Sequence, residues 1–421
     1  MNQTIEKEVL ERFLRYVKID TRSDEEGKGS PSTECQFDLL KLLEVELLEL
    51  GLKDVKLTQT GVLTALLPGN VKAASAGDAP TIGYLAHVDT YHGTSGKDVK
   101  PQIIENYDGK DIVLAGTGDV LKVSENPDLS GFVGKTVITT DGTTLLGADD
   151  KAGVAEIMTF LSVLKANPSL PHGPVKIAFT PDEEIGKGTA NFPTLEEFGA
   201  HVAYTIDGGP EGEVENETFC ADTAFVTLKG KDVHPGYAKG KMVNAVRAAA
   251  HLISLLPGES LPETTEGKQG YLHPLAINGD VTKVTIPLLV RDFDLDMLKV
   301  WEGRLEGLIR KTCEAFPGLT YELRAEHSYK NMRYYLDKEP RAVSLAMEAV
   351  RLAGMTPHLQ SIRGGTDGSR LSEKGLPTPN IFEGGRNFHS VQEWIPLPAM
   401  VQAVQTLVEL AGLWAKERVG G

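Results

Sequence analysis

Cysteine is scarce in this sequence. The chain has 421 residues but only three cysteines, which stand far apart at Cys35, Cys220 and Cys313. Their number and spacing provide neither a disulfide framework nor a Cys-x-x-Cys metal site. We therefore expect a reducing, cytoplasmic environment, and we expect any bound metal to be held by histidine and carboxylate side chains.

Long hydrophobic runs and an excess of positive charge are also missing. No apolar stretch approaches the roughly 20 residues of a transmembrane helix. The opening stretch, "MNQTIEKEVLERFLRYV", carries acids where a signal peptide would need an apolar segment. The net charge of −16 argues against nucleic acid or an anionic membrane as a partner. These absences predict a soluble globular protein with no nucleic acid and no membrane partner.

The length of the chain predicts more than one domain, because a single hydrophobic core rarely serves more than about 250–300 residues. Helical patterns cover residues 4–18 and 33–50. The second helix is expected to begin with a cap from Ser32 or Thr33 and to end at Gly51.

Four short apolar runs have the length and composition of strands that are buried on both faces. They are "TIGYLA" (81–86), "VKIAFT" (175–180), "VAYTI" (202–206) and "TPNIF" (378–382). Further helical patterns alternate with them and follow them, at residues 152–166, 343–353 and 399–416. This alternation predicts an α/β domain with a mixed sheet covered by helices.

Residues 214–330 have a different pattern. Two successive strand–helix units and a final strand predict a small open sheet with helices on one face, an α+β arrangement of the ferredoxin-like type. The α/β pattern resumes afterwards. We therefore predict one α/β domain in two parts, 1–213 and 331–421, interrupted by an inserted smaller domain of residues 214–330.

Polar side chains follow each of the four predicted α/β strands. They are His87 and Asp89 after the first strand, Asp182, Glu183 and Glu184 after the second, Asp207 after the third, and Glu383 and His389 after the fourth. Asp149 and Asp150 stand where a predicted helix begins. Because ligands bind at the carboxyl ends of strands in open α/β sheets, these side chains are expected to converge.

Each of these residues also has an ordinary structural explanation. The pair Asp149–Asp150 is typical of a helix N-cap, and Glu183–Glu184 of a solvated acidic turn. Asp207 before two glycines is typical of a turn, and His87 of a core histidine. Taken together, however, they indicate a bound cation, because an unpaired cluster of ionised acids is costly to bury. Mixed histidine and carboxylate ligands suit zinc, manganese or cobalt.

Seven stretches, in order along nearly the whole chain, carry a resemblance to a known family. They are "HVDT" (87–90), "LLGADDKAG" (145–153), "AFTPDEEIGKG" (178–188), "YTIDGG" (204–209), "VHPGYAKGKMVNA" (233–245), "IRGGTDGS" (362–369) and "PNIFEGGRNFH" (379–389). The chain resembles the aminotripeptidases of the dinuclear-zinc exopeptidase family, which also holds glutamate carboxypeptidases and succinyl-diaminopimelate desuccinylases. Residues 115–133 carry no motif of this kind.

The resemblance implies two bound zinc ions, with cobalt or manganese as substitutes. The implied ligands are His87 and Asp207 for one metal, Glu184 and His389 for the other, and Asp149 as the bridge between them. Asp89 would orient His87. Glu183 would be the general base that takes a proton from the attacking water and later delivers it to the leaving amine. Asp182 would belong only to the turn.

In this family the inserted domain is a lid. The resemblance implies that His234 in "VHPG" donates to the oxyanion, although a histidine before Pro235 is also typical of a plain turn. Arg291 and Arg363 are candidates to bind the terminal carboxylate of the peptide. Each of the two is equally compatible with an exposed or structural arginine.

The implied activity is removal of the N-terminal amino acid from tripeptides, with short peptides as substrates and a homodimer formed through the lid. A family relative acting as a dipeptidase or as a deacylase of N-acyl amino acids would use the same metals and is an alternative. A phosphate- or nucleotide-binding protein is disfavoured, because neither Gly-x-x-x-x-Gly-Lys-Ser/Thr nor Gly-x-Gly-x-x-Gly follows a predicted strand. Glu183 disfavours a passive metal-binding relative, since a passive site needs no free base.

Overall fold

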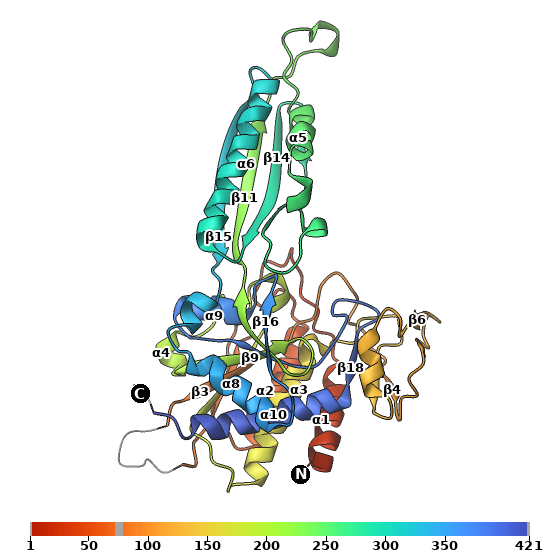
Figure 1. Ribbon diagram of the computed structural model, residues 1–421, viewed down its shortest axis with the longest axis vertical. Helices are drawn as coiled ribbons and strands as arrows, with labels where there is room; N and C mark the ends of the chain where they lie inside the picture. The colour runs from red at the N-terminus through yellow and green to blue at the C-terminus, as the bar shows by residue number, and fades with distance from the viewer. Residues whose placement is uncertain (1, 72–78, 419–421) are drawn as a thin grey trace. The chain divides into compact units, whose positions relative to one another are not determined.

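The structure is a computed structural model that describes residues 2–71 and 79–418 (Figure 1). The chain divides into two compact units. The first unit comprises Met1–Asn216, Tyr335–Gln360 and Thr366–Gly421, and the second comprises Glu217–Tyr334 and Ser361–Gly365. The sequence pattern placed the insertion at 214–330 and did not assign the short segment Ser361–Gly365 to it.

An eight-stranded sheet forms the centre of the first unit, in the order β1-β2-β8-β3-β9-β17-β10-β16. The strands are β1 (Lys53–Leu57), β2 (Leu63–Leu67), β3 (Ile82–His87), β8 (Val175–Thr180), β9 (Val202–Gly208), β10 (Glu213–Thr218), β16 (His358–Ile362) and β17 (Asn380–Phe382). Neighbours among β8, β3, β9 and β17 pair in parallel, whereas β1–β2, β2–β8 and β10–β17 are antiparallel pairs. The predicted mixed sheet is confirmed, and the four strands expected from the sequence are these four parallel ones.

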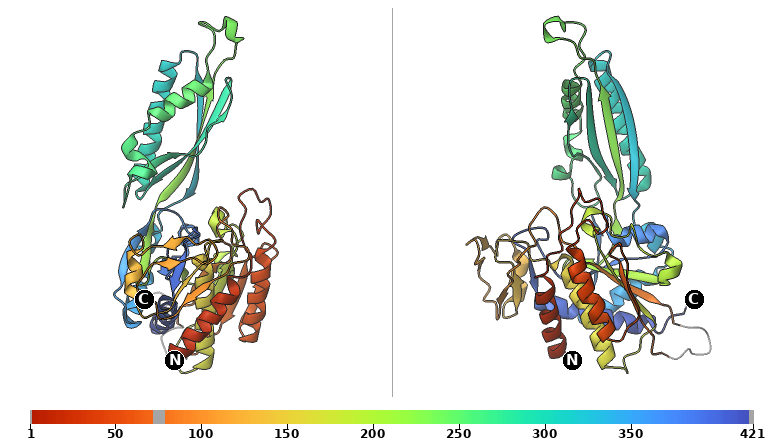
Figure 2. Two further views of the ribbon diagram at one scale, coloured as in Figure 1. Left: turned by 90° about the vertical axis from the view of Figure 1, so that its right-hand side faces the viewer. Right: turned by 180° about the vertical axis from the view of Figure 1, so that it is seen from behind.

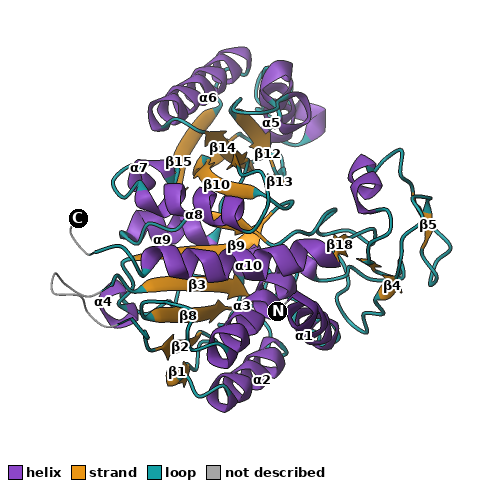
Figure 3. Cartoon of the chain, turned by 60° about the horizontal axis from the view of Figure 1, so that its bottom comes forward, coloured by secondary structure: helices purple, strands orange, loops and turns teal. Residues whose placement is uncertain are grey.

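Helices cover both faces of this sheet (Figure 3). They are α1 (Asn2–Tyr16), α2 (Gln36–Glu49), α3 (Ala148–Ala166), α4 (Leu195–Phe198), α8 (Arg341–Leu352), α9 (Asp367–Lys374) and α10 (Leu397–Trp414). On one face the ring of Tyr84 from β3 meets Phe160 of α3 edge-on. Its neighbour Leu85 points to the opposite face, where it joins a buried cluster with Phe198 and Leu371 from α4 and α9. Within the described residues, no helix is both long enough and apolar enough to cross a membrane.

The predicted cap of α2 is wrong. The helix follows an N-cap at Cys35 that makes no side-chain cap hydrogen bond. Ser32 instead donates from its backbone N–H and its hydroxyl to the carboxylate of Asp182, at 2.7 and 2.5 Å. Asp182 lies 150 residues further along the chain. A local sequence pattern therefore could not show that Ser32 binds Asp182 and not the start of the helix.

Residues around the unassigned stretch 115–133 form two small sheets. One has the order β18-β7-β4 and the other pairs β5 with β6. The elements are β4 (Gln102–Ile104), β5 (Ile112–Val113), β6 (Val120–Leu121), the 3-10 helix η1 (Pro127–Phe132), β7 (Val137–Thr139) and β18 (Trp394–Pro396). Their buried side chains, including Leu121, Leu129 and Phe132, form one cluster with Trp394. The stretch without a motif therefore packs against the segment that follows His389.

The second unit has its own sheet, in the order β12-β14-β11-β15, with β13 paired to β14. Its elements are β11 (Cys220–Lys229), α5 (Ala245–Ser254), β12 (Tyr271–Pro274), β13 (Asn278–Gly279), β14 (Lys283–Asp292), α6 (Leu295–Ala315), β15 (Thr320–Tyr329) and, at the boundary, α7 (Arg333–Leu336). Val226 and Leu228 of β11 share one buried cluster with Leu252 of α5 and Leu305 of α6. Because strand side chains alternate between faces, α5 and α6 cover the same face of the sheet (Figure 2).

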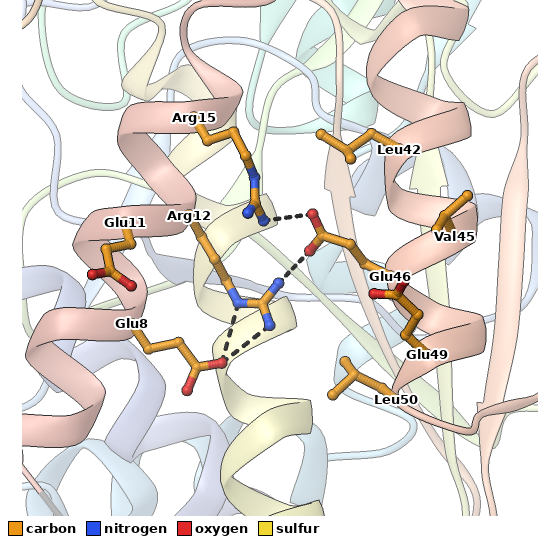
Figure 4. Close-up of a pocket in the computed structure, with 9 residues that line it drawn as sticks. All are labelled: Glu8, Glu11, Arg12, Arg15, Leu42, Val45, Glu46, Glu49 and Leu50. Carbon is orange, nitrogen blue, oxygen red and sulfur yellow. Dashed lines mark hydrogen bonds and ion pairs between the residues drawn. The ribbon is translucent and has the colours of Figure 1, made fainter.

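A network of charges joins α1 to α2 in the first unit. Figure 4 shows Arg12 and Arg15 reaching from α1 towards the carboxylate of Glu46 on α2. The hydroxyl of Tyr16 also donates to Glu46, at 2.6 Å. Glu46 and Arg12 have side chains that are only 11% and 13% exposed. Because water screens these charges weakly, removing one member of the network would leave its partners poorly solvated and unpaired, which costs more than breaking a surface ion pair.

We predict that Glu46→Ala lowers the free energy of unfolding by about 2–3 kcal/mol, because Arg12, Arg15 and Tyr16 then lose the carboxylate that they share, and Arg12 keeps only Glu8 in a poorly solvated position. Glu49→Ala is the matched control, since Glu49 is an exposed acid on the same helix, and it should change stability by less than about 0.5 kcal/mol. Urea unfolding followed by circular dichroism measures both. Equal small effects would show that the network contributes little.

Candidate metal centre

The carboxyl ends of the parallel strands bring the predicted polar residues to one edge of the large sheet. His87 is the last residue of β3 and stands opposite Thr180, the last residue of β8. Asp207 lies at the end of the neighbouring strand β9, and α3 begins at Ala148, next to Asp149. The side chains described below meet at this edge.

The imidazole of His87 lies among carboxylates. Its Nε2 is 2.9 Å from Asp149 Oδ1 and 3.5 Å from Asp207 Oδ1. Its backbone N–H donates to Asp150 Oδ2 at 3.0 Å. The side chain of His87 is 2% exposed. It is therefore a buried histidine, but its surroundings are charged rather than apolar.

His389 approaches the same group from the loop after β17. Its Nε2 lies 2.9 Å from Glu184 Oε2 and 3.1 Å from Asp149 Oδ2. The ring of Tyr91 stacks on the imidazole, with centroids 4.1 Å apart and planes inclined by 7°. The hydroxyl of Thr94 donates to the carbonyl oxygen of His389 at 2.7 Å. His389 is thus held on its ring and on its backbone.

Asp149 connects the two histidines, because one carboxylate oxygen faces His87 and the other faces His389. The N-cap interpretation of Asp149 is wrong, since both oxygens of its carboxylate face the histidines and not the first turn of α3. Close approach of α3 to β9 depends on Gly153. A Cβ atom at that position would lie 2.0 Å from the carbonyl oxygen of Ile206, so only glycine fits beside the strand that carries Asp207.

Asp89 ties His87 to the acidic turn after β8. It is completely buried, and its Oδ1 lies 3.3 Å from His87 Nδ1. The same carboxylate accepts the backbone N–H of Glu183 at 2.9 Å and that of Glu184 at 3.2 Å. Asp89 therefore contacts the far nitrogen of a candidate ligand, as expected, and also fixes the backbone of the turn.

The three consecutive acids of "DEE" have three different surroundings. Asp182 adopts the left-handed conformation, with φ 59°, which aspartate tolerates in turns. Its buried carboxylate accepts from Ser32 and from Gln36 Nε2 at 2.8 Å. Glu183 begins a short 3-10 helix, η2 (Glu183–Ile185). The side chain of Glu184 is 6% exposed, so a solvated turn does not describe this stretch.

Opposite charges govern the protonation of both histidines. Burial alone lowers the pKa of His87, but Asp207 and Asp149 outweigh burial and raise that pKa well above its ordinary value. Burial also lowers the pKa of His389, whereas Asp149 and Glu184 raise it to about 10. Without another cation, protons on the two rings supply the positive charge that these acids require.

The same surroundings shift the pKa values of the neighbouring carboxylates in different directions. Burial and the nearby charge of Asp149 raise the pKa of Glu184 to about 8. Burial and the charge of Asp207 raise the pKa of Glu183 well above its ordinary value. For Asp149 burial acts in the same direction, but hydrogen bonds from His389 and His87 hold its pKa well below the usual range. Asp149 is thus the acid most strongly stabilised in its ionised form.

The donor set fits divalent cations. The ligand atoms of His87, Asp149 and Glu184 all lie within 4.8 Å of one another, and so do those of His87, Asp150 and Asp207. In the part of the chain that the structure describes, the buried oxygens Glu184 Oε1 and Asp150 Oδ1 have no hydrogen-bond partner. Unpaired carboxylate oxygens are costly to bury, and imidazole with carboxylate suits zinc, manganese or cobalt.

His234 lies in the second unit, at the start of the 3-10 helix η3 (Pro235–Tyr237). The residue is exposed, and its Nδ1 accepts a hydrogen bond from the backbone N–H of Gly236 at 3.1 Å. In the neutral ring the proton therefore lies on Nε2. The turn expected before Pro235 is present, and the N–H donor of the His234 ring lies at Nε2, opposite the nitrogen that the turn uses.

The two candidate arginines also belong to the second unit. Nη1 of Arg291 donates to the carbonyl oxygens of Asp222 and Val290, at 2.8 and 3.0 Å. Arg363 comes from Ser361–Gly365 and donates three hydrogen bonds to the loop after the 3-10 helix η5 (Pro262–Thr264). These bonds go to Gly267 O, Gln269 O and Thr265 Oγ1 at 2.7, 2.9 and 2.8 Å. Both arginines thus have structural contacts.

Two residues that support the His389 loop were not anticipated. Tyr91 directly follows "HVDT", and its position beside that motif is a signal that could have identified it. Asn126 accepts a hydrogen bond from Asn387 Nδ2 at 2.8 Å. Asn387 and His389 both have positive φ, 56° and 62°. Asn126 lies in the stretch without a motif, and no local pattern distinguishes it.

Comparison with known proteins places this geometry in a family. The model of "Peptidase family M20/M25/M40" matches residues 115–412. Peptidase T of Salmonella schwarzengrund (strain CVM19633) is 47% identical over 409 residues, which cover 97% of this chain and 98% of that protein. Peptidase T of Caldanaerobacter subterraneus subsp. tengcongensis is 47% identical over 410 residues, which cover 97% of this chain and 99% of that protein.

Solved structures show the same fold. The aminopeptidase PepT from Bacillus cereus ATCC 10987 has a TM-score of 0.75 at 23% identity, covering 98% of this chain and 99% of that one. A tripeptidase from Staphylococcus aureus subsp. aureus mu50 has a TM-score of 0.75 at 24% identity, with the same coverage of 98% and 99%. A dinuclear metal-binding M20 peptidase from Bacillus subtilis has a TM-score of 0.64 at 15% identity, covering 98% of each chain.

The family match covers well over half of the chain, and the named relatives match nearly all of it. The likeness to dinuclear exopeptidases in the sequence motifs is thereby confirmed. The chain belongs to peptidase family M20/M25/M40.

Proposed function

We propose that this protein is a metal-dependent aminopeptidase that removes the N-terminal amino acid from tripeptides. The observation that carries this proposal is the Asp149 carboxylate, which faces His87 through one oxygen and His389 through the other. Relatives that share 47% of the sequence are named peptidase T, and a structure of the same fold is described as a tripeptidase. Short peptides are therefore the proposed substrates.

Two metal positions are proposed, each with its own pair of ligands. The pairs are His87 with Asp207 and Glu184 with His389, and Asp149 belongs to both. Zinc is the proposed metal, with cobalt or manganese as substitutes. Bound cations of this kind polarise the scissile carbonyl and lower the pKa of a water molecule. The orphaned oxygen of Glu184 supports the assignment, because a cation would satisfy it.

Glu183 is the proposed general base. Its backbone N–H is fixed by Asp89, and its partly buried carboxylate feels the charges of Asp207 and His87, which supports a place beside the metal pair. That carboxylate takes a proton from the attacking water and delivers it to the nitrogen of the leaving amine. Asp89 is proposed to orient His87 through Nδ1.

The second unit is proposed to supply the remaining contacts to the substrate. His234 is assigned as the donor to the oxyanion, since its neutral ring carries the proton on Nε2. Arg291 and Arg363 are assigned to the terminal carboxylate of the peptide. An arginine has five N–H groups, so the three hydrogen bonds of Arg363 leave two for a substrate. Equal KM values for a tripeptide and its C-terminal amide would contradict a role for either arginine.

Cellular location and assembly are also proposed. The scarcity of cysteine supports a cytoplasmic location, and the family resemblance is the ground for a homodimer, which sedimentation velocity would test. The related activities are separated by a panel of dipeptides, tripeptides and N-acyl amino acids. Release of a free N-terminal amino acid from tripeptides alone supports the proposal, whereas turnover restricted to dipeptides or N-acyl amino acids would replace it.

Metal removal is predicted to abolish hydrolysis and to lower the melting temperature. The acids around His87 then lose their counter-charge, and the native state loses the stabilisation of about 2.7 kcal/mol that a ligand at 100 times its dissociation constant provides. Adding zinc, cobalt or manganese should restore both properties. Elemental analysis must confirm that the stripped protein is metal-free, and full turnover in that state would end the metallopeptidase proposal.

Glu183 and Glu184 are predicted to fail differently when each is changed to glutamine. Glu183→Gln cannot accept the proton of the water, so kcat should fall by about 10²–10⁴ while the metal content stays at the wild-type value. Glu184→Gln loses a charged ligand, so metal should be lost first and added metal should restore part of the activity. Metal analysis with single-turnover kinetics measures both variants, and the opposite pattern would reverse the two assignments.

His234→Ala is predicted to lower kcat by about 10²–10³, the usual effect of losing one oxyanion donor. Metal content and melting temperature should stay unchanged, because His234 is exposed and caps only a single short turn. Steady-state kinetics on a tripeptide, with metal analysis as the control, tests this. Normal turnover would reduce His234 to a turn residue.

A further inference from the structure

We propose that Glu393 is a positioning residue for Asp149 and that it thereby sets the affinity of both metal positions. This inference rests on the proposed function, because it assumes that Asp149 is shared between two metals. Glu393 lies four residues beyond His389 in the sequence. It is 1% exposed, although it is an ionisable residue.

The carboxylate of Glu393 holds the backbone of the turn that carries Asp149. Its Oε2 accepts the N–H groups of Leu146 and Gly147 at 2.7 and 2.8 Å. Its Oε1 accepts those of Ala148 and Asp149 at 2.7 and 3.2 Å. A carboxylate offers about four acceptor positions, so this one is fully used by four consecutive backbone donors.

The sequence around the turn provides no substitute for this carboxylate. The first N–H groups of a helix have no partners within the helix and attract negative charge. Gly147 has no side chain that could accept the N–H groups of this turn, and Asp149 and Asp150 interrupt the start of α3 with non-helical φ and ψ. The carboxylate of Asp149 itself faces the two histidines. Glu393 therefore accepts, from a distant part of the sequence, the four N–H groups of the turn that leads into α3.

Glu393 and His389 belong to one closed loop. Its ends are joined by paired backbone hydrogen bonds between Arg386 and Trp394, at 2.9 and 3.1 Å, and Glu393 N–H donates to Ser390 O at 3.2 Å. This loop contacts Asp149 twice. His389 Nε2 meets the Asp149 side chain at 3.1 Å, and Glu393 Oε1 accepts the Asp149 N–H at 3.2 Å.

Asp149 is consequently held at both ends by a single loop, which fixes where its carboxylate points. A change at Glu393 would release four N–H groups at once and let the turn move relative to His389. Because Asp149 is proposed to serve both metals, both affinities should fall together. Loss of a ligand that serves one metal, such as Asp207, would instead affect one position first.

The test is Glu393→Gln in the full chain, with Glu409→Gln as the matched control. Glutamine keeps the size of the side chain but turns an NH₂ group towards two of the four donors. Glu409 is exposed on α10, so its change removes the same charge elsewhere. Titration of zinc into metal-free protein against a chromophoric chelator measures the affinity of each equivalent. We expect both equivalents to bind about 10–100-fold more weakly in Glu393→Gln, and as in wild type in the control.

A helix cap without influence on the site would behave differently. The melting temperature of metal-free Glu393→Gln would fall, but the folded variant would bind both zinc equivalents with wild-type affinity, and this result would overturn the proposal. Weakening of one equivalent alone would overturn it as well. If Glu393→Gln does not fold, the same titration on Glu393→Asp decides, since aspartate keeps the charge but is one methylene shorter. Failure of the wild-type protein to bind zinc would instead refute the proposed function.

Discussion

Repulsion among carboxylates is the constraint on which the rest of the first unit depends. Four parallel strands end at one edge of the sheet, and Asp149, Asp207 and Glu184 meet there around two histidines. Ionised acids at such distances are unfavourable unless positive charge and hydrogen-bond donors surround them. The acids raise the pKa of both histidines for this reason, and their unneutralised charge also makes the edge of the sheet suitable for divalent cations.

Backbone N–H groups from distant parts of the chain supply hydrogen-bond donors to other buried acids around this edge. Asp89 accepts two from the turn after β8, and Glu393 accepts four from the turn before α3. Asp182 binds back to Ser32 before α2. Asp89, Asp182 and Glu393, which hold no proposed metal, thus fix the backbone of the segments from which Asp149 and Glu184 project. This network of hydrogen bonds, more than any single strand, therefore determines where the proposed ligands lie.

The second unit has a hydrophobic cluster of its own, between one face of its sheet and the helices α5 and α6. The change of sequence pattern at residues 214–330 predicted an inserted domain, because a strand–helix repeat can form a core from its own apolar faces. Ser361–Gly365 was not predicted to belong to this unit, in which Arg363 donates to the carbonyl oxygens of Gly267 and Gln269. Such polar contacts produce no periodic pattern of residues in the sequence.

The sequence by itself determined the four parallel strands, the helices α1, α2, α3, α8 and α10, and the edge at which His87, Asp207 and His389 would meet. These features follow from local periodicity and from the rule that parallel strands present their carboxyl ends together. Only the tertiary structure decided that Ser32 binds Asp182 instead of capping α2, that Asn126 supports the loop of His389, and that Glu393 holds the turn of Asp149. The physical reason is that each of these hydrogen bonds joins residues 150 or more positions apart, where local spacing carries no information about contact.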